Sequence, residues 1–179
     1  LGDRETFKYA LAATLVNLGN IFLLTHDYAS ARGLYEEALV KQRELGDQQR
    51  IATSLNNLGS LARLEGNRQV SEALFRESLQ LARLIGDRRL TVSAIQGLAK
   101  MALDRGDPLH AALLFACSER IVEELRYAQA DDDRDETERY LARLKDSLSE
   151  EARARAWQDG RAMDVDDVLR MGSEQHPAS

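Results

Sequence analysis

Residues 55–60 of this chain read Leu-Asn-Asn-Leu-Gly-Ser, and the pattern returns forty positions to either side. Residues 15–20 read Leu-Val-Asn-Leu-Gly-Asn, and residues 95–100 read Ile-Gln-Gly-Leu-Ala-Lys. The same offset aligns small, leucine and aromatic positions downstream: Ala31, Ser71 and Ala111; Leu34, Leu74 and Leu114; Tyr35, Phe75 and Phe115. One offset kept without gaps over so many positions indicates an internal repeat of 40 residues.

Turn residues divide each repeat into two helices. Gly66-Asn67 and Gly106-Asp107 lie at equivalent positions in the second and third repeats, and His26-Asp27 takes their place in the first. Glycine adopts the left-handed conformation that ends a helix, and Asp or Asn caps the next one. Gly46-Asp47 and Gly86-Asp87 close the first two repeats in the same way. These signals predict helices near 5–25, 28–45, 48–65, 68–85, 88–105 and 108–128.

The composition narrows the class of protein. The 179 residues include 11 glycines, two prolines and one cysteine, which favours long helices and excludes a disulfide framework. No uninterrupted apolar run approaches the roughly 18 residues of a membrane span, so we expect no membrane contact. Residues 1–128 carry 16 acidic and 16 basic side chains, and residues 129–179 carry 14 and 8. Neither part predicts the basic face that nucleic acids require.

The pattern Leu18, Gly19, Phe22, Ala31, Tyr35 and Ala38, which returns in both later repeats, resembles the tetratricopeptide repeat. The period of 40 is similar to the longer repeats of kinesin light chains and many bacterial regulators. The resemblance implies an all-α fold, a right-handed superhelix of three helical hairpins over residues 1–128 (repeats 4–47, 48–87 and 88–128).

The C-terminal segment predicts capping helices over residues 129–172 and a disordered tail over residues 173–179. An amphipathic stripe begins at Tyr140 and leads to Trp157, and we expect Gly160 to end that helix. Asp164 is predicted to cap a last short helix. Residues 157–168 are similar to a closing motif of large bacterial signalling regulators of LuxR, SARP or cyclase-linked type. That resemblance implies a cytoplasmic C-terminal sensor or scaffold within a longer regulator.

No catalytic pattern is present in the sequence. Phosphate-binding and dinucleotide-binding glycine motifs are missing, and His26, His110 and His176 lack the spacing of metal ligands. Cys117 is predicted to be a structural thiol rather than a nucleophile, and Trp157 a core residue rather than a ligand-stacking one. We therefore expect no enzyme activity, no metal and no cofactor.

The resemblance implies a concave groove lined by the first helix of each repeat. The candidate peptide-binding residues at those positions are Asn17, Asn20, Thr53, Asn56, Asn57, Ser60, Arg63, Gln96 and Lys100. Asparagine both donates and accepts, which suits a peptide backbone. Asn20 and Asn57 match two asparagines of the carboxylate clamp of chaperone-binding relatives, but the clamp's basic residues are missing. Asn17 and Asn57 could equally bond neighbouring helices.

Two functions remain open at this point. The first is a protein- or peptide-binding interaction module, and the second is a structural spacer or self-association segment without a ligand of its own. Residues 1–3, Leu-Gly-Asp, copy the turn that closes a repeat, which predicts that a preceding repeat is missing. Phe7, Leu11, Leu15 and Tyr35 would then be uncovered, and we expect a homodimer through this N-terminal edge.

Overall fold

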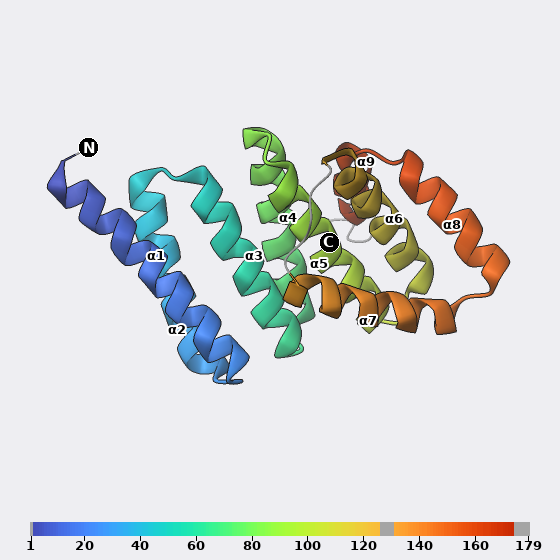
Figure 1. Ribbon diagram of the computed structural model, residues 1–179, viewed down its shortest axis with the longest axis horizontal. Helices are drawn as coiled ribbons and strands as arrows, with labels where there is room; N and C mark the ends of the chain where they lie inside the picture. The colour runs from blue at the N-terminus through green and yellow to red at the C-terminus, as the bar shows by residue number, and fades with distance from the viewer. Residues whose placement is uncertain (1, 126–130, 174–179) are drawn as a thin grey trace. The chain divides into compact units, whose positions relative to one another are not determined.

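The computed structural model describes residues 2–125 and 131–173. Across these ranges the chain is all-helical and contains no strand, which confirms the predicted fold class. Three hairpins come first, as shown in Figure 1: α1 (Asp3–Leu24) with α2 (Tyr28–Leu45), α3 (Gln48–Leu64) with α4 (Arg68–Ile85), and α5 (Arg88–Asp104) with α6 (Pro108–Leu125). They are followed by α7 (Asp131–Ser147), α8 (Glu150–Ala162) and α9 (Val165–Ser173).

The predicted turn chemistry is confirmed at the junctions from α1 to α6. Gly46, Gly66, Gly86 and Gly106 all have positive φ, and His26 takes the same left-handed conformation with φ of 62°. The following Asp or Asn then accepts a hydrogen bond from the first turn of the next helix. The Arg50 backbone N–H, for example, donates to Asp47 Oδ1 at 3.1 Å. These local signals explain why the first six helices lie within three residues of their predicted bounds.

The chain forms two compact units, Leu1–Gly86 and Asp87–Ser179. The first unit contains two hairpins, and α2 of the first packs against α3 of the second. Its core is a cluster around Tyr35, Leu55 and Leu61, all fully buried. Handedness and the predicted division into repeats, capping helices and tail remain predictions. Within that division, Ser173 belongs to α9, and residues 174–179 of the predicted tail lie outside the described residues.

Small residues bring the two helices of a hairpin close together. A Cβ added to Gly59 would lie 3.0 Å from the Phe75 ring, and one added to Gly19 would lie 2.6 Å from the Tyr35 ring. The Ser71 hydroxyl donates to the Gly59 carbonyl oxygen at 2.8 Å, so this buried polar group is satisfied across the hairpin. The recurring small residue therefore makes room for the aromatic ring of its own repeat.

The second unit adds three helices to the third hairpin. α8 packs against α6, and Figure 1 shows α7 crossing the lower end of this unit. Two expectations for this region were wrong. The stripe from Tyr140 to Trp157 is two helices, because Ser149 caps α8 by accepting from the Ala152 N–H at 3.2 Å. Gly160 does not end α8, which continues to Ala162, and its backbone instead contacts Leu113 of α6.

The expected uncovered edge is only partly present. Phe7 is 68% exposed, but Leu15 is 9% exposed and Tyr35 is fully buried, because α2 folds over α1. Besides Phe7, the large apolar residues Leu18, Ile21 and Leu24 of α1 are exposed. The segment Glu5–Leu24 of this helix also has the length and mean hydropathy (1.4) of a membrane span. This finding differs from the sequence-based expectation, which considered only uninterrupted apolar runs. A signal sequence and a core helix share these two properties, so they do not define the role of α1.

Candidate functional site

Three of the predicted asparagines of the first unit lie on α1 and α3 with unused hydrogen-bonding groups. Asn17 is exposed, and Asn56 and Asn57 are half-buried. Within the described part of the chain none of the three side-chain amides hydrogen-bonds another residue. The Asn56 Oδ1 atom is buried and still lacks a partner. The alternative in which Asn17 and Asn57 bond neighbouring helices therefore has no hydrogen bond to support it in these ranges.

Two other predicted residues of this unit are used by the fold. Asn20 Oδ1 accepts from the Tyr35 hydroxyl at 2.7 Å, and the surrounding core raises the pKa of Tyr35 to about 12 because burial disfavours the phenolate. The Thr53 hydroxyl donates a hydrogen bond to the Gln49 carbonyl oxygen at 3.0 Å. Ser60 and Arg63 are half-buried on the same helix as Thr53. Asn20 is consequently better described as a support for Tyr35 than as a free clamp residue.

In the second unit the predicted residues lie beneath α7. Gln96 and Lys100 are 7% and 8% exposed. Lys100 Nζ contacts Glu136 Oε2 at 2.5 Å and lies 5.9 Å from the centre of the Tyr140 ring. The α5 face that the repeat pattern assigns to ligand binding is thus covered at Lys100 by a helix of the same chain.

Asp104, at the end of α5, provides the second attachment of α7. Its carboxylate accepts from the Tyr140 hydroxyl at 2.9 Å and from Arg143 Nη1 at 3.0 Å. The bond to Asp104 raises the pKa of Arg143, so this guanidinium stays charged. The sequence contained one usable signal, because Glu136, Tyr140 and Arg143 follow the i, i+4, i+7 spacing of a single helix face.

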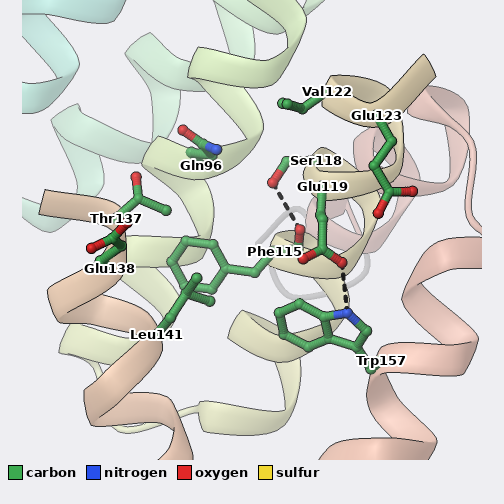
Figure 2. Close-up of a pocket in the computed structure, with 10 residues that line it drawn as sticks. All are labelled: Gln96, Phe115, Ser118, Glu119, Val122, Glu123, Thr137, Glu138, Leu141 and Trp157. Atoms are coloured by element: carbon green, nitrogen blue, oxygen red, sulfur yellow. Dashed lines mark hydrogen bonds between the residues drawn. The ribbon is translucent and has the colours of Figure 1, made fainter. Parts of the chain in front are cut away.

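A cavity of about 220 Å³ lies between α5, α6, α7 and α8, and sequence reasoning missed it. Figure 2 shows the Phe115 ring and the Trp157 indole on one side and polar groups around them. The residues that line it are Gln96, Phe115, Ser118, Glu119, Val122, Glu123, Thr137, Glu138, Leu141 and Trp157. Of these, only Gln96 was predicted from the sequence to bind a ligand, because the lining groups converge from helices far apart in the chain.

An ion-pair network fixes the α8 side of this cavity. Trp157 Nε1 donates to Glu119 Oε2 at 2.9 Å, and Arg161 donates to the same carboxylate at 3.2 Å. Arg161 also binds both oxygens of Glu123, at 3.1 and 2.6 Å, and this pairing lowers the pKa of Glu123. Trp157 is half-buried, and its indole is held in place by Glu119. It is thus neither fully a core residue nor a freely exposed ligand-stacking residue, the two roles considered from the sequence.

The thiol and the described histidines form no reactive constellation. Cys117 is fully buried, burial raises its pKa, and its Sγ–H donates to the Met163 carbonyl oxygen at 3.6 Å. His26 contacts Tyr28, His110 contacts Arg105, and His176 lies outside the described residues. Over residues 2–125 and 131–173, no group of three or more His, Cys, Asp or Glu residues could hold a metal ion.

Comparison with known families gave two matches that together cover both units in part. Two models, each described as tetratricopeptide repeat, match residues 11–48 and residues 50–124. The boundary between them falls at the turn that closes the first repeat. No curated protein matches the chain.

Proposed function

Because the chain belongs to the tetratricopeptide repeat family, whose repeats generally mediate protein–protein interaction, we propose that it is a non-catalytic module that binds a peptide segment of a protein partner. The binding surface is the face of α1 and α3 that carries Asn17, Asn56 and Asn57. We also propose that the other candidate residues predicted from the sequence line the concave face of the repeats and contact the same peptide.

The observation that carries this proposal is the pair of equivalent amides at Asn17 and Asn57. They are forty residues apart, are accessible, and make no hydrogen bond in the described chain. An asparagine side chain can donate to a peptide carbonyl and accept from a peptide N–H. Two such side chains can therefore bind the backbone of a peptide whatever its amino-acid sequence.

The test is selection of binding peptides from a random display library, followed by calorimetry on each selected peptide. The double variant Asn17→Ala/Asn57→Ala should weaken binding by about tenfold or more, equivalent to the loss of two hydrogen bonds. Gln80→Ala is the matched control, since Gln80 is an exposed amide on α4, a second helix. Peptides whose affinity the two asparagines do not affect, or a library that yields no binder, would contradict the proposal.

The finer context is also a proposal: the segment serves as the cytoplasmic C-terminal sensor or scaffold of a larger bacterial transcriptional or signalling regulator. Its support is the similarity of residues 157–168 to the closing motif of such proteins. Residues 157–168 include the end of α8, which packs against α6, and this packing suits a capping role. Sequencing the gene on both sides of this segment tests the proposal. A gene that encodes repeats without any regulator domain would refute it.

A structural or self-association role is the second candidate, and the open apolar face of α1 favours it. Leu58 and Leu61 are 4% and 0% exposed where α2 packs on α3, whereas their repeat equivalents Leu18 and Ile21 are 40% and 57% exposed. We propose that a second copy covers this face in a homodimer. Light scattering over a concentration series should then show a dimer that Ile21→Glu converts to monomer, while a concentration-independent monomer would refute pairing.

A further inference from the structure

A separate groove of the second unit lies between α7 and α8, and we call it the α7–α8 groove. Figure 1 shows the two helices extending from the short link that joins them. The groove has a volume of about 640 Å³, within the range of roughly 300–1,000 Å³ that is usual for ligand-binding clefts. It is lined from α7 by Leu141, Leu144 and Lys145, and from α8 by residues that include Arg153, Trp157 and Arg161.

An apolar surface with an ordered aromatic ring forms part of the groove. Leu141 and Trp157 are half-buried, so both remain accessible from the groove. The hydrogen bond from Trp157 Nε1 to Glu119 fixes the indole, so the ring loses little freedom when a ligand packs on it. Arg153, Trp157 and Arg161 follow one another at every fourth residue of α8 and therefore share one face of the helix. Tryptophan and arginine are among the residues that most often provide the binding energy of protein interfaces.

The charged side chains of the groove are basic. Lys145, Arg153 and Arg161 line it, and among the described residues no aspartate or glutamate does. Arg161 is already paired with Glu119 and Glu123. Lys145 is exposed and Arg153 is half-buried, and within residues 2–125 and 131–173 neither forms a hydrogen bond or an ion pair. Two cations thus lie next to an apolar surface without a carboxylate partner from the described chain.

The acidic residues of the same helix lie on another surface. Glu151 and Asp159 line a different cavity, which α8 forms with Leu109 and Leu113 of α6. Glu150 is exposed three residues before Arg153, but within the described chain the two form no ion pair. The charge of the groove is therefore available to carboxylates of another molecule.

We propose that the α7–α8 groove binds an acidic segment of a partner protein. An apolar side chain of that segment packs on Leu141 and Trp157, and a neighbouring Asp or Glu side chain pairs with Lys145 and Arg153. Lys145 lies in the last turn of α7 and Arg153 in the first turn of α8, so the two cations are close to the same end of the groove. Charge complementarity selects this occupant, because a basic segment would be repelled by both cations and a neutral one would leave them unpaired.

Trp157 provides the reporter for the test, because it is the single tryptophan of the chain and lines the groove. The probes are capped and amidated hexapeptides in which Asp or Glu alternates with Leu or Phe, so that all their carboxylates are on side chains. The best acidic peptide should change Trp157 emission saturably. It should bind at least about tenfold more tightly than the same peptide with Asn and Gln in place of Asp and Glu. Equal affinity of these two peptides, or no acidic peptide that binds, would overturn the proposal.

Three variants locate the binding site on α8 and at the end of α7. Lys145→Gln and Arg153→Gln should each weaken the acidic peptide several-fold. The melting temperature should stay unchanged, because neither side chain has a partner in the described chain. Arg155→Gln is the matched control, since it removes the same charge from the same helix but lines the cavity on the α6 side. Equal weakening by Arg153→Gln and Arg155→Gln would show a general effect of charge and overturn the proposal.

This inference goes beyond the proposed function, because the groove belongs to the second unit and Asn17 and Asn57 belong to the first. The double variant Asn17→Ala/Asn57→Ala should therefore bind the acidic peptide as tightly as the unchanged chain, and a loss of affinity in it would overturn the assignment to the α7–α8 groove. Failure of every acidic peptide would leave the function proposed for the asparagines intact. Decanoate, a carboxylate on an apolar chain, tests the small-molecule alternative. Decanoate that binds in an Arg153-dependent way when no acidic peptide binds would overturn the choice of a protein segment.

Discussion

Replacing Gly160 by alanine tests the packing of α8 on α6. In an isolated helix this change stabilises by about 1 kcal/mol. Here an added Cβ would lie 2.8 Å from Leu113 Cα and 2.9 Å from Ala116 Cβ, with the Leu113 carbonyl oxygen closer still. Because two of these atoms are backbone, α8 must move away from α6 to admit the methyl group. Overpacking of this kind costs about 1–3 kcal/mol, and the upper end applies where no flexible side chain can move aside.

The expected net loss for Gly160→Ala is therefore about 2 kcal/mol, or a fall in melting temperature of roughly 4–8 °C for a chain of this size. Trp157 lies on α8, so its fluorescence during urea unfolding reports the affected unit directly. Gly33→Ala is the matched control, since Gly33 lies inside α2 with no atom within 4 Å of an added Cβ, and it should stabilise by about 1 kcal/mol in circular dichroism melts. A stabilised Gly160→Ala would refute the close approach of α8 to α6.

Four further outcomes are expected. Gly59→Leu should lower stability by about 1–3 kcal/mol in a thermal melt, because the Phe75 ring occupies the space that the side chain needs; an unchanged melt would contradict the helix faces. Burial raises the pKa of Tyr35 to about 12, so the fold should be fully stabilised below pH 10 and should lose about 2–3 kcal/mol of stability between pH 10 and 12. Denaturation of the wild-type chain and of Tyr35→Phe over that pH range checks this, because the variant should not show the loss. Cys117 should react with a thiol reagent at pH 8 only at the rate of unfolding, and immediate labelling of the folded protein would be inconsistent with its burial. His26→Gly should raise stability by about 1 kcal/mol, because glycine adopts the positive φ of this turn without strain; calorimetry that shows a loss would argue against it.

The hairpins could be predicted from the sequence because their signals are local. A glycine at positive φ followed by a capping Asp or Asn marks a boundary within four residues of chain, and the signal is the same at Gly46 and Gly86. Gly160 illustrates where this reasoning stops. Glycine also occurs where two helices approach closely, and only the position of Leu113 in space separates that use from a helix end.

The candidate site also has one part that could be predicted from the sequence and one part that could not. The accessible amides of Asn17 and Asn57 follow from repeat position, because the repeat places them on the first helix of each hairpin. The burial of Lys100 does not, since it depends on Glu136 and Tyr140 of a helix that crosses α5 outside the repeat pattern. The cavity lined by Phe115 and Trp157 was missed for the same reason, because its walls come from four helices that no single window of sequence contains.

The turns at Gly46 and Gly86 have a consequence for how such a chain can change in length. Their φ angles are 68° and 70°, and each is followed by an aspartate that caps the next helix. Removing residues 47–86 would join Gly46 to Asp87 and restore the junction Leu-Gly-Asp unchanged. Duplicating the same stretch would likewise create no new junction. Recombination between repeats can therefore shorten or lengthen the gene in steps of one hairpin, and every product keeps turns that already fold.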